Sequence, residues 1–199
     1  MTSKLFSKTL RTNLNIPLAL AISLVPDIDL LLEPALIHGG PTHSILLLTI
    51  LFIPAFFIWK KASLPYLASA ASHSIIGDYL TRLPKHRGVQ LLYPLNSTFY
   101  SARPEVTQLT YIYSEIIMFV AFLFLLVAAR DTKALTKVHP SNFLFIIPIL
   151  TAALPVFIEF PLPVPSQLII PHLALMVILA VPILLDLESY IRKAISPQA

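Results

Sequence analysis

The sequence predicts an all-α fold, a polytopic bundle of membrane-spanning helices. Of its 199 residues, 56% are hydrophobic and only 12% are charged, whereas a soluble domain carries roughly 25% charged residues. The mean hydropathy is +0.80. The 18 prolines lie among Leu, Ile and Phe rather than in polar tracts, which excludes a disordered or collagen-like chain. An integral membrane protein is the class that remains.

Six mostly apolar stretches are candidate spans, because a helix that crosses the hydrocarbon needs roughly 20 such residues. In chain order, the predicted spans are 12–29, 42–59, 62–80, 107–129, 139–158 and 166–185. The first and third meet carboxylates before a full-length apolar run is complete. Since polar groups at membrane depth are costly and usually functional, we expect a site at these two spans.

The distribution of basic residues predicts the orientation of the spans. A cytoplasmic N-terminus places ten of the 14 Lys and Arg residues inside and four outside, as the positive-inside rule requires. We therefore expect six spans with both termini in the cytoplasm (N-in/C-in). We expect a single membrane domain over residues 1–199, with a motif-bearing half at about 12–106 and a three-span half at about 107–199.

The absence of cysteine and the distribution of charge limit the kinds of site that the chain can form. The chain has no cysteine, which excludes disulfides, thiolate metal sites, iron–sulfur clusters and cysteine nucleophiles. Any metal must be held by His, Asp or Glu. The net charge of +4 reflects basic loops rather than a nucleic-acid surface, so membrane lipids are expected partners and nucleic acid is not.

Candidate ligands gather at the ends of the first three predicted spans. Three carboxylates and two imidazoles fall within 17 residues: Asp27, Asp29, Glu33, His38 and His43. Pro26 interrupts the helix, so Asp27 and Asp29 are freed from helical phase and could turn toward one ion.

The third span adds His73 and Asp78. In the six-span arrangement all these segments meet at the outer face. Carboxylate and imidazole ligands suit Zn²⁺, Mn²⁺ or Fe²⁺, and the set could hold one or two such divalent ions.

Several short motifs, in this order along the chain, resemble the signatures of the YdjM-like inner-membrane metal-dependent hydrolases. They are Pro26-Asp27-Ile28-Asp29, His38 with Thr42-His43-Ser44, the segment from His73 to Asp78 with Thr81, and Gly88-Val89 leading to Leu91-Leu92-Tyr93-Pro94-Leu95. The resemblance covers about residues 16–96. It implies a metal-dependent hydrolase embedded in the cytoplasmic (inner) membrane of a prokaryote.

The sequence departs from this family pattern at two positions. A basic residue is expected after the first loop histidine, but Gly39 stands there, which would remove a contact to substrate. The expected spacing of the third motif is four, whereas His73 and Asp78 are five apart. Five residues of α-helix separate side chains by about 140°. Either a π-bulge at Gly77 restores the alignment, or one of the pair is not a ligand.

The connection over residues 81–106 carries four basic residues on the outer side of the membrane, where the positive-inside rule predicts few. These are Arg82, Lys85, Arg87 and Arg103. Long loops are commonly functional, and cations above a metal site could neutralise a phosphate or carboxylate substrate. Ordinary solvated charge is the alternative interpretation.

These observations predict a hydrolase of an ester or phosphoester. The predicted first ligands are Asp27, Asp29, His43 and Asp78, with His73 and His38 next. A water activated by the metal would attack the substrate, and Glu33 would accept a proton. A site at headgroup depth favours a lipid or lipid-linked substrate. A metal or proton transporter and a non-enzymatic membrane scaffold or regulator are the alternatives.

Overall fold

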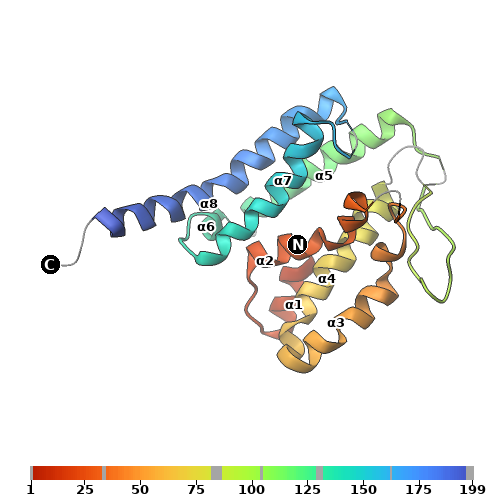
Figure 1. The fold of residues 1–199 in the computed structure, drawn as a ribbon, viewed down its shortest axis with the longest axis horizontal. Coiled ribbons are helices and arrows are strands. Elements are labelled where there is room, and N and C mark those ends of the chain that lie inside the picture. Colours follow the sequence, from red (N-terminus) through yellow and green to blue (C-terminus); the bar gives the residue numbers. More distant parts are fainter. Residues whose placement is uncertain are drawn as a thin grey trace. The chain divides into compact units, whose positions relative to one another are not determined.

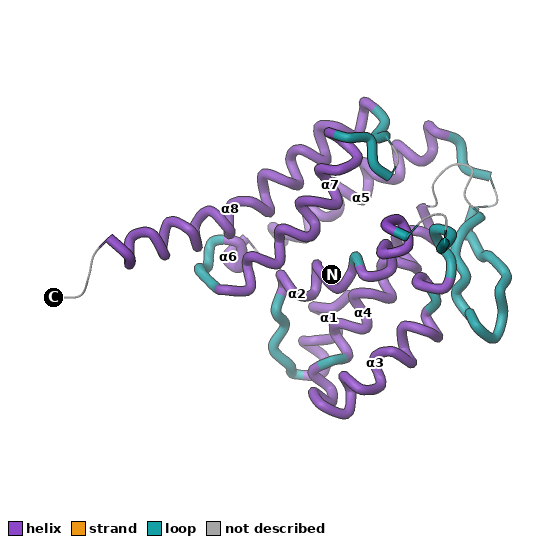
Figure 2. Tube along the Cα trace, viewed as in Figure 1, coloured by secondary structure: helices purple, strands orange, loops and turns teal. Residues whose placement is uncertain are grey.

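The computed structural model describes residues 2–32, 35–81, 87–103, 105–128, 132–161 and 163–195. Within these ranges the chain is helical and contains an isolated bridge between Val89 and Tyr100, but no strand (Figure 1, Figure 2). The α-helices are α1 (Thr2–Leu10), α2 (Ile16–Ser23), α3 (Ile45–Trp59), α4 (Leu64–Ser72), α5 (Gln108–Ala128), α6 (Thr132–Leu135), α7 (Ile146–Phe157) and α8 (Ile169–Ile195). The 3₁₀ and π segments are η1 (Val25–Leu31), η2 (Pro41–His43), η3 (Lys60–Ala62), η4 (His73–Tyr79), η5 (Pro140–Phe145) and η6 (Ser166–Leu168).

The chain divides into two compact units, Met1–Glu115 and Ile116–Ala199. In the first unit, α4 packs against α1, α2 and α3 (Figure 1). Ala19 of α2 and Ala70 of α4 are buried, and Ser69 Oγ donates a hydrogen bond of 2.7 Å to the carbonyl of Ala19. Small side chains let membrane helices approach closely, so these residues explain why α4 is the central helix of the unit.

Helix α1 is an element that the sequence analysis did not predict. It packs on α4, and its Ser3 and Ser7, one turn apart, are buried. Asn15 then begins α2: its side chain accepts a hydrogen bond of 3.0 Å from the backbone of Leu18, and its own N–H donates to the hydroxyl of Tyr66 in α4 at 3.1 Å. These contacts fix the direction in which α2 leads to the candidate site.

Four helical stretches are long and apolar enough to cross a membrane: Ile45–Ala62, Gln108–Ala128, Pro140–Phe157 and Ser166–Ile195. They correspond to the second, fourth, fifth and sixth predicted spans, so an all-helical, polytopic membrane fold is confirmed. The first and third predicted spans have no such helix, because α2 ends after 8 residues and α4 after 9, where η1 and η4 begin. Six spans and the N-in/C-in orientation are therefore not confirmed.

The second unit is built on the packing of α7 and η5 against α8. Asp186 of α8 is fully buried. Its Oδ1 accepts hydrogen bonds from the backbone of His139 at 3.0 Å and from Nδ2 of Asn142 at 3.1 Å. The carboxylate thereby holds the start of η5 against α8 within this unit.

Candidate metal centre

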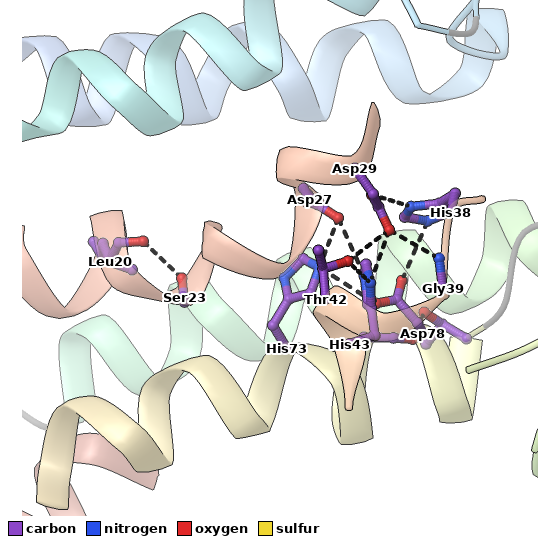
Figure 3. Close-up of polar contacts among 12 residues, drawn as sticks. Leu20, Ser23, Asp27, Asp29, His38, Gly39, Thr42, His43, His73 and Asp78 are labelled. Carbon is purple, nitrogen blue, oxygen red and sulfur yellow. Dashed lines mark hydrogen bonds and ion pairs between the residues drawn. The ribbon is translucent and has the colours of Figure 1, made fainter. Parts of the chain in front are cut away.

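Asp27 and Asp29 are positioned by η1, which follows α2 after one residue. Pro26 stands in the first turn of this 3₁₀ helix, where the missing N–H has no helical partner to lose. The side chain of Asp27 is 20% exposed and that of Asp29 is fully buried. Both carboxylates nevertheless point to the same group of histidines (Figure 3), as the interruption by proline predicted.

His38 and His43 lie on either side of a glycine-rich turn. Gly39 has a φ of +77°, and a Cβ built on it would lie 2.2 Å from the carbonyl oxygen of Gly88. No side chain fits at this position, which explains why glycine replaces the basic residue expected there. A hydrogen bond also stabilises the turn: the backbone N–H of Gln90 donates to the carbonyl of Gly39 at 2.8 Å.

His73 and Asp78 lie on η4, which is a π-helix over His73–Tyr79. The hydrogen bonds of a π-helix connect residues five apart, so residues with this spacing share one face. Nε2 of His73 lies 3.3 Å from Oδ2 of Asp78. The π-turn, one of the two alternatives that the spacing left open, is therefore confirmed.

One ligand atom each from Asp27, His43, His73 and Asp78 lies within 4.8 Å of the others. Nε2 of His43 is 3.5 Å from Oδ1 of Asp27 and 3.0 Å from Oδ2 of Asp78. Nε2 of His73 is 3.0 Å from the same oxygen of Asp27. We call these four residues the open group.

The open group has the spacing of a metal site. Four ligand atoms about 2.0 Å from Zn²⁺ in tetrahedral geometry lie about 3.3 Å apart, close to the distances seen here. Nε2 of His43 and Oδ2 of Asp78 are buried and lie 3.0 Å apart, but neither forms an aligned hydrogen bond within the described part of the chain, a rare and costly state for buried polar atoms. A divalent cation between them would satisfy both.

A second candidate group consists of Asp27, Asp29, His38 and His43, so it shares two members with the open group. Asp29 is its centre. Oδ1 of Asp29 lies 3.1 Å from Nδ1 of His38, and Oδ2 accepts from the backbone of Gly39 at 3.2 Å (Figure 3). Three hydrogen bonds to Asp29 hold this group together, whereas the open group has one, between Nε2 of His73 and Oδ1 of Asp27, among the described contacts.

Electrostatics favours charged groups in the cluster. Burial raises the pKa of Asp27, but the neighbouring imidazoles of His43 and His73 outweigh that effect and leave the pKa well below its usual range. Burial lowers the pKa of His43, but its three neighbouring carboxylates raise it to about 11. Both residues lie outside the four candidate spans. A cation that binds here must therefore displace a proton from His43.

The segment 87–103 packs against the histidine turn. Oγ of Ser44, the residue after His43, donates to the carbonyls of Leu91 at 3.2 Å and Tyr93 at 2.7 Å. The same hydroxyl caps α3 by accepting from the backbone of Leu47. The segment thereby fixes the junction between η2, which carries His43, and the start of α3.

Two of the four predicted substrate-binding cations lie within the described residues. Arg87 and Arg103 are exposed. Nη1 of Arg103 donates to Oγ of Ser114 in α5 at 3.1 Å, and the neighbouring Ala102 donates from its backbone to the carbonyl of Tyr79 at 2.9 Å. Arg103 is thus held near the end of η4 that carries Asp78. Glu33, Arg82 and Lys85 lie outside the described residues.

Helix α5 contributes polar residues that the predicted site does not include. Glu115 contacts Thr81 and lies within electrostatic reach of Asp78. With Tyr111, one turn earlier, and Ser114, it gives the start of an otherwise apolar helix a polar face. That i, i+3, i+4 spacing was the available signal, because polar residues on a membrane helix usually face protein or water.

Comparison with protein families matches residues 2–159 to the YdjM inner membrane protein family. The chain belongs to this family. All six predicted metal ligands lie inside the matched region, and the family together with the apolar helices identifies an integral protein of the inner membrane. Neither the comparison with curated proteins nor the comparison with solved structures found a match. The YdjM family description itself names no reaction.

Proposed function

We propose that this YdjM family protein is a membrane-embedded, metal-dependent hydrolase of an ester or phosphoester. The observation that carries the proposal is the open group, in which three separate segments bring two carboxylates and two imidazoles to distances of 3.0–3.5 Å. Two buried atoms of this group make no hydrogen bond to any described residue. Such a set is more costly without a cation than with one.

The donor set favours Zn²⁺, Mn²⁺ or Fe²⁺, because imidazole and carboxylate together suit these ions. A bound divalent cation would supply Lewis acidity and lower the pKa of a coordinated water toward neutrality. The protein's own contribution is to hold the ligands on three backbone segments and to bury them. Glu33 remains the proposed proton acceptor.

An anionic substrate is favoured by the cations beside the site. Arg103 is anchored on Ser114, and a guanidinium held in this way can bind phosphate or carboxylate oxygens. Arg82, Lys85 and Arg87 belong to the same proposed set. The site also adjoins the start of α3, since His43 is followed directly by the cap residue Ser44. A site at the end of a span lies at the depth of the lipid headgroups, and this position favours a lipid or lipid-linked substrate.

We also propose six spans with both termini in the cytoplasm and the site at the outer face. The bias of Lys and Arg toward one side supports this orientation. The helical run Leu64–Tyr79 is at most about 24 Å long, since an α-helix rises about 1.5 Å per residue. A bilayer core measures about 30 Å. A span that starts at the inner surface would therefore end just below the outer one, which is where a lipid headgroup could reach it.

Metal analysis of the protein purified in detergent is the first test. Wild-type protein should contain near-stoichiometric Zn, Mn or Fe, and Asp27→Ala and His43→Ala should lose it while remaining folded. His172→Ala is the matched control, because His172 lies in the second unit and its ring bonds only to the carbonyl of Leu168 among the described contacts. Unchanged metal content in both site variants would leave a scaffold or regulator as the better description.

Turnover separates a hydrolase from a transporter. The metal-loaded protein should hydrolyse members of a panel of phosphoesters and lipid esters, and removal of the metal by a chelator should abolish this activity. Metal or proton flux in sealed vesicles that is lost in Asp27→Ala, with no hydrolysis of any substrate in the panel, would instead establish transport.

A further inference from the structure

We infer that Asp29 is a positioning residue that orients His38 and His43, and that it does not bind the metal itself. This inference rests on the metal-dependent function proposed above. It departs from the sequence prediction, which placed Asp29 beside Asp27 among the first ligands. The two carboxylates are two residues apart, but the structure surrounds them with different partners.

The oxygens of Asp29 are occupied by donors of the protein. Oδ1 lies 3.1 Å from Nδ1 of His38. Oδ2 accepts from the backbone of Gly39 at 3.2 Å and from Oγ1 of Thr42 at 2.9 Å, and lies 3.1 Å from Nδ1 of His43. A carboxylate offers about four acceptor positions. Three hydrogen bonds and the charged contact with His43 thus engage both oxygens of Asp29, and its side chain is fully buried.

Turning Asp29 toward a metal would leave these donors without an acceptor. A buried donor that loses its partner costs about 1–3 kcal/mol, and several would lose theirs together. Asp27 is in the opposite situation. Its Oδ1 faces Nε2 of both His43 and His73, the atoms through which these rings can bind a cation.

The contacts of Asp29 also decide which nitrogen of His43 carries hydrogen. Oγ1 of Thr42 lies 2.9 Å from Oδ2 of Asp29 and 3.2 Å from Nδ1 of His43. If Thr42 donates to the carboxylate, its oxygen accepts the Nδ1 hydrogen of His43. The reverse arrangement would point a lone pair of Nδ1 at the carboxylate. Nδ1 therefore holds hydrogen, and Nε2 is the atom left for the cation.

The same reasoning applies to His38, whose Nδ1 also faces Asp29. Its Nε2 then points toward Asp78, 4.0 Å from Oδ1, while Nε2 of His43 lies 3.0 Å from Oδ2 of that residue. One buried carboxylate thus turns two imidazoles toward Asp78. Carboxylates that orient metal-binding histidines in this way raise ligand basicity and metal affinity.

Metal affinity of the full-length protein distinguishes the two roles. In a chelator competition with Zn²⁺, Asp29→Asn should bind as many ions as wild type, with a Kd raised about 10- to 100-fold. Asp27→Asn should lose the ion. With Co²⁺ as a spectroscopic probe, Asp29→Asn at saturation should keep the wild-type visible absorption bands, because the atoms that bind the cation are unchanged.

A second pair of variants avoids altering the carboxylate. Thr42→Val removes the bridging hydroxyl and should lower Zn²⁺ affinity, and Thr42→Ser should restore it. Thr49→Val is the control, since Thr49 is exposed and its Oγ1 donates, among the described contacts, only to the carbonyl of Ile45 in the same helix.

Two results would overturn the inference while leaving the metal site in place. One is loss of the ion in Asp29→Asn with the same spectral change as in Asp27→Asn, which would make Asp29 a ligand. The other is an unchanged Kd in both Asp29→Asn and Thr42→Val. Wild-type protein that binds no divalent ion would overturn the proposed function and this inference with it.

Discussion

Nε2 of His73 lies 3.3 Å from Oδ2 of Asp78 although the two residues are five positions apart. In an α-helix this spacing would turn their side chains about 140° away from each other. The π-helix η4 removes that divergence. π-turns are rare and occur frequently at functional sites, so η4 is itself an argument that the cluster is used.

The length of η4 gives the first prediction. Deleting Ile75 leaves His73 and Asp78 four apart, a spacing that an ordinary α-helix places on one face. This variant should retain metal. Inserting Ala after Ile75 makes the spacing six, which neither helix type aligns, and metal should be lost. Elemental analysis of the two purified proteins checks this. Equal metal content in both would show that the π-turn is not needed.

The turn between His38 and His43 gives the second prediction. Gly39→Ala places a Cβ 2.2 Å from the carbonyl of Gly88 at a φ of +77°. It should destabilise the protein by about 2 kcal/mol or more and weaken Zn²⁺ binding. Gly77→Ala is the matched control, because a Cβ there meets nothing within 4 Å. Thermal unfolding in detergent should separate the two variants, and equal melting temperatures would contradict the clash.

Arg103 is the subject of the third prediction. Arg103→Ala should lower kcat/KM about tenfold or more, as the loss of a charge-stabilising donor does, and leave metal content unchanged. Arg192→Ala is the control, because Arg192 pairs with Glu188 on the exposed face of α8. Turnover measured on an anionic phosphoester compares them. Equal activity in the two variants would assign Arg103 to the solvated surface.

Orientation in the membrane gives the fourth prediction. The chain has no cysteine, so single cysteines report without background. Leu95→Cys, at a position 84% exposed, should react with an impermeant thiol reagent in intact cells. Lys61→Cys, at the opposite end of α3, should react only after permeabilisation. The reverse pattern would place the site in the cytoplasm, with the metal ligands unaffected.

Much of the site could be predicted because its residues are conspicuous in an apolar chain. A membrane protein with only ten carboxylates and six histidines has few reasons to place Asp27, His43 and Asp78 at the ends of apolar runs. Burial of charge is costly there, so position alone is informative. The same reasoning left the structure of the third motif open between a π-turn and a missing ligand, which only the backbone could decide.

Other features depend on hydrogen-bond geometry that composition does not encode. Asp27 and Asp29 are the same residue type in the same motif, but Asp29 accepts from the backbone N–H of Gly39, a residue with left-handed φ, whereas Asp27 faces His73. Helices α2 and α4, in the first and third apolar stretches, are short because the backbone beyond them forms 3₁₀ or π hydrogen bonds instead of α-helical ones. Hydropathy reports how apolar a stretch is, not which hydrogen bonds it forms, so both stretches were predicted as full spans.

The contact between Nε2 of His73 and Asp27 joins residues 46 positions apart, and this has a consequence for biosynthesis. Chains emerge from the ribosome N-terminus first. Asp27, Asp29 and His43 are therefore synthesised, and α3 can enter the bilayer, before η4 exists. Until η4 arrives, Asp27 lacks its contact with His73 and His43 lacks its contact with Asp78, so the open group is incomplete. Loading of the proposed metal would accordingly follow synthesis of this third segment rather than accompany translation of the first.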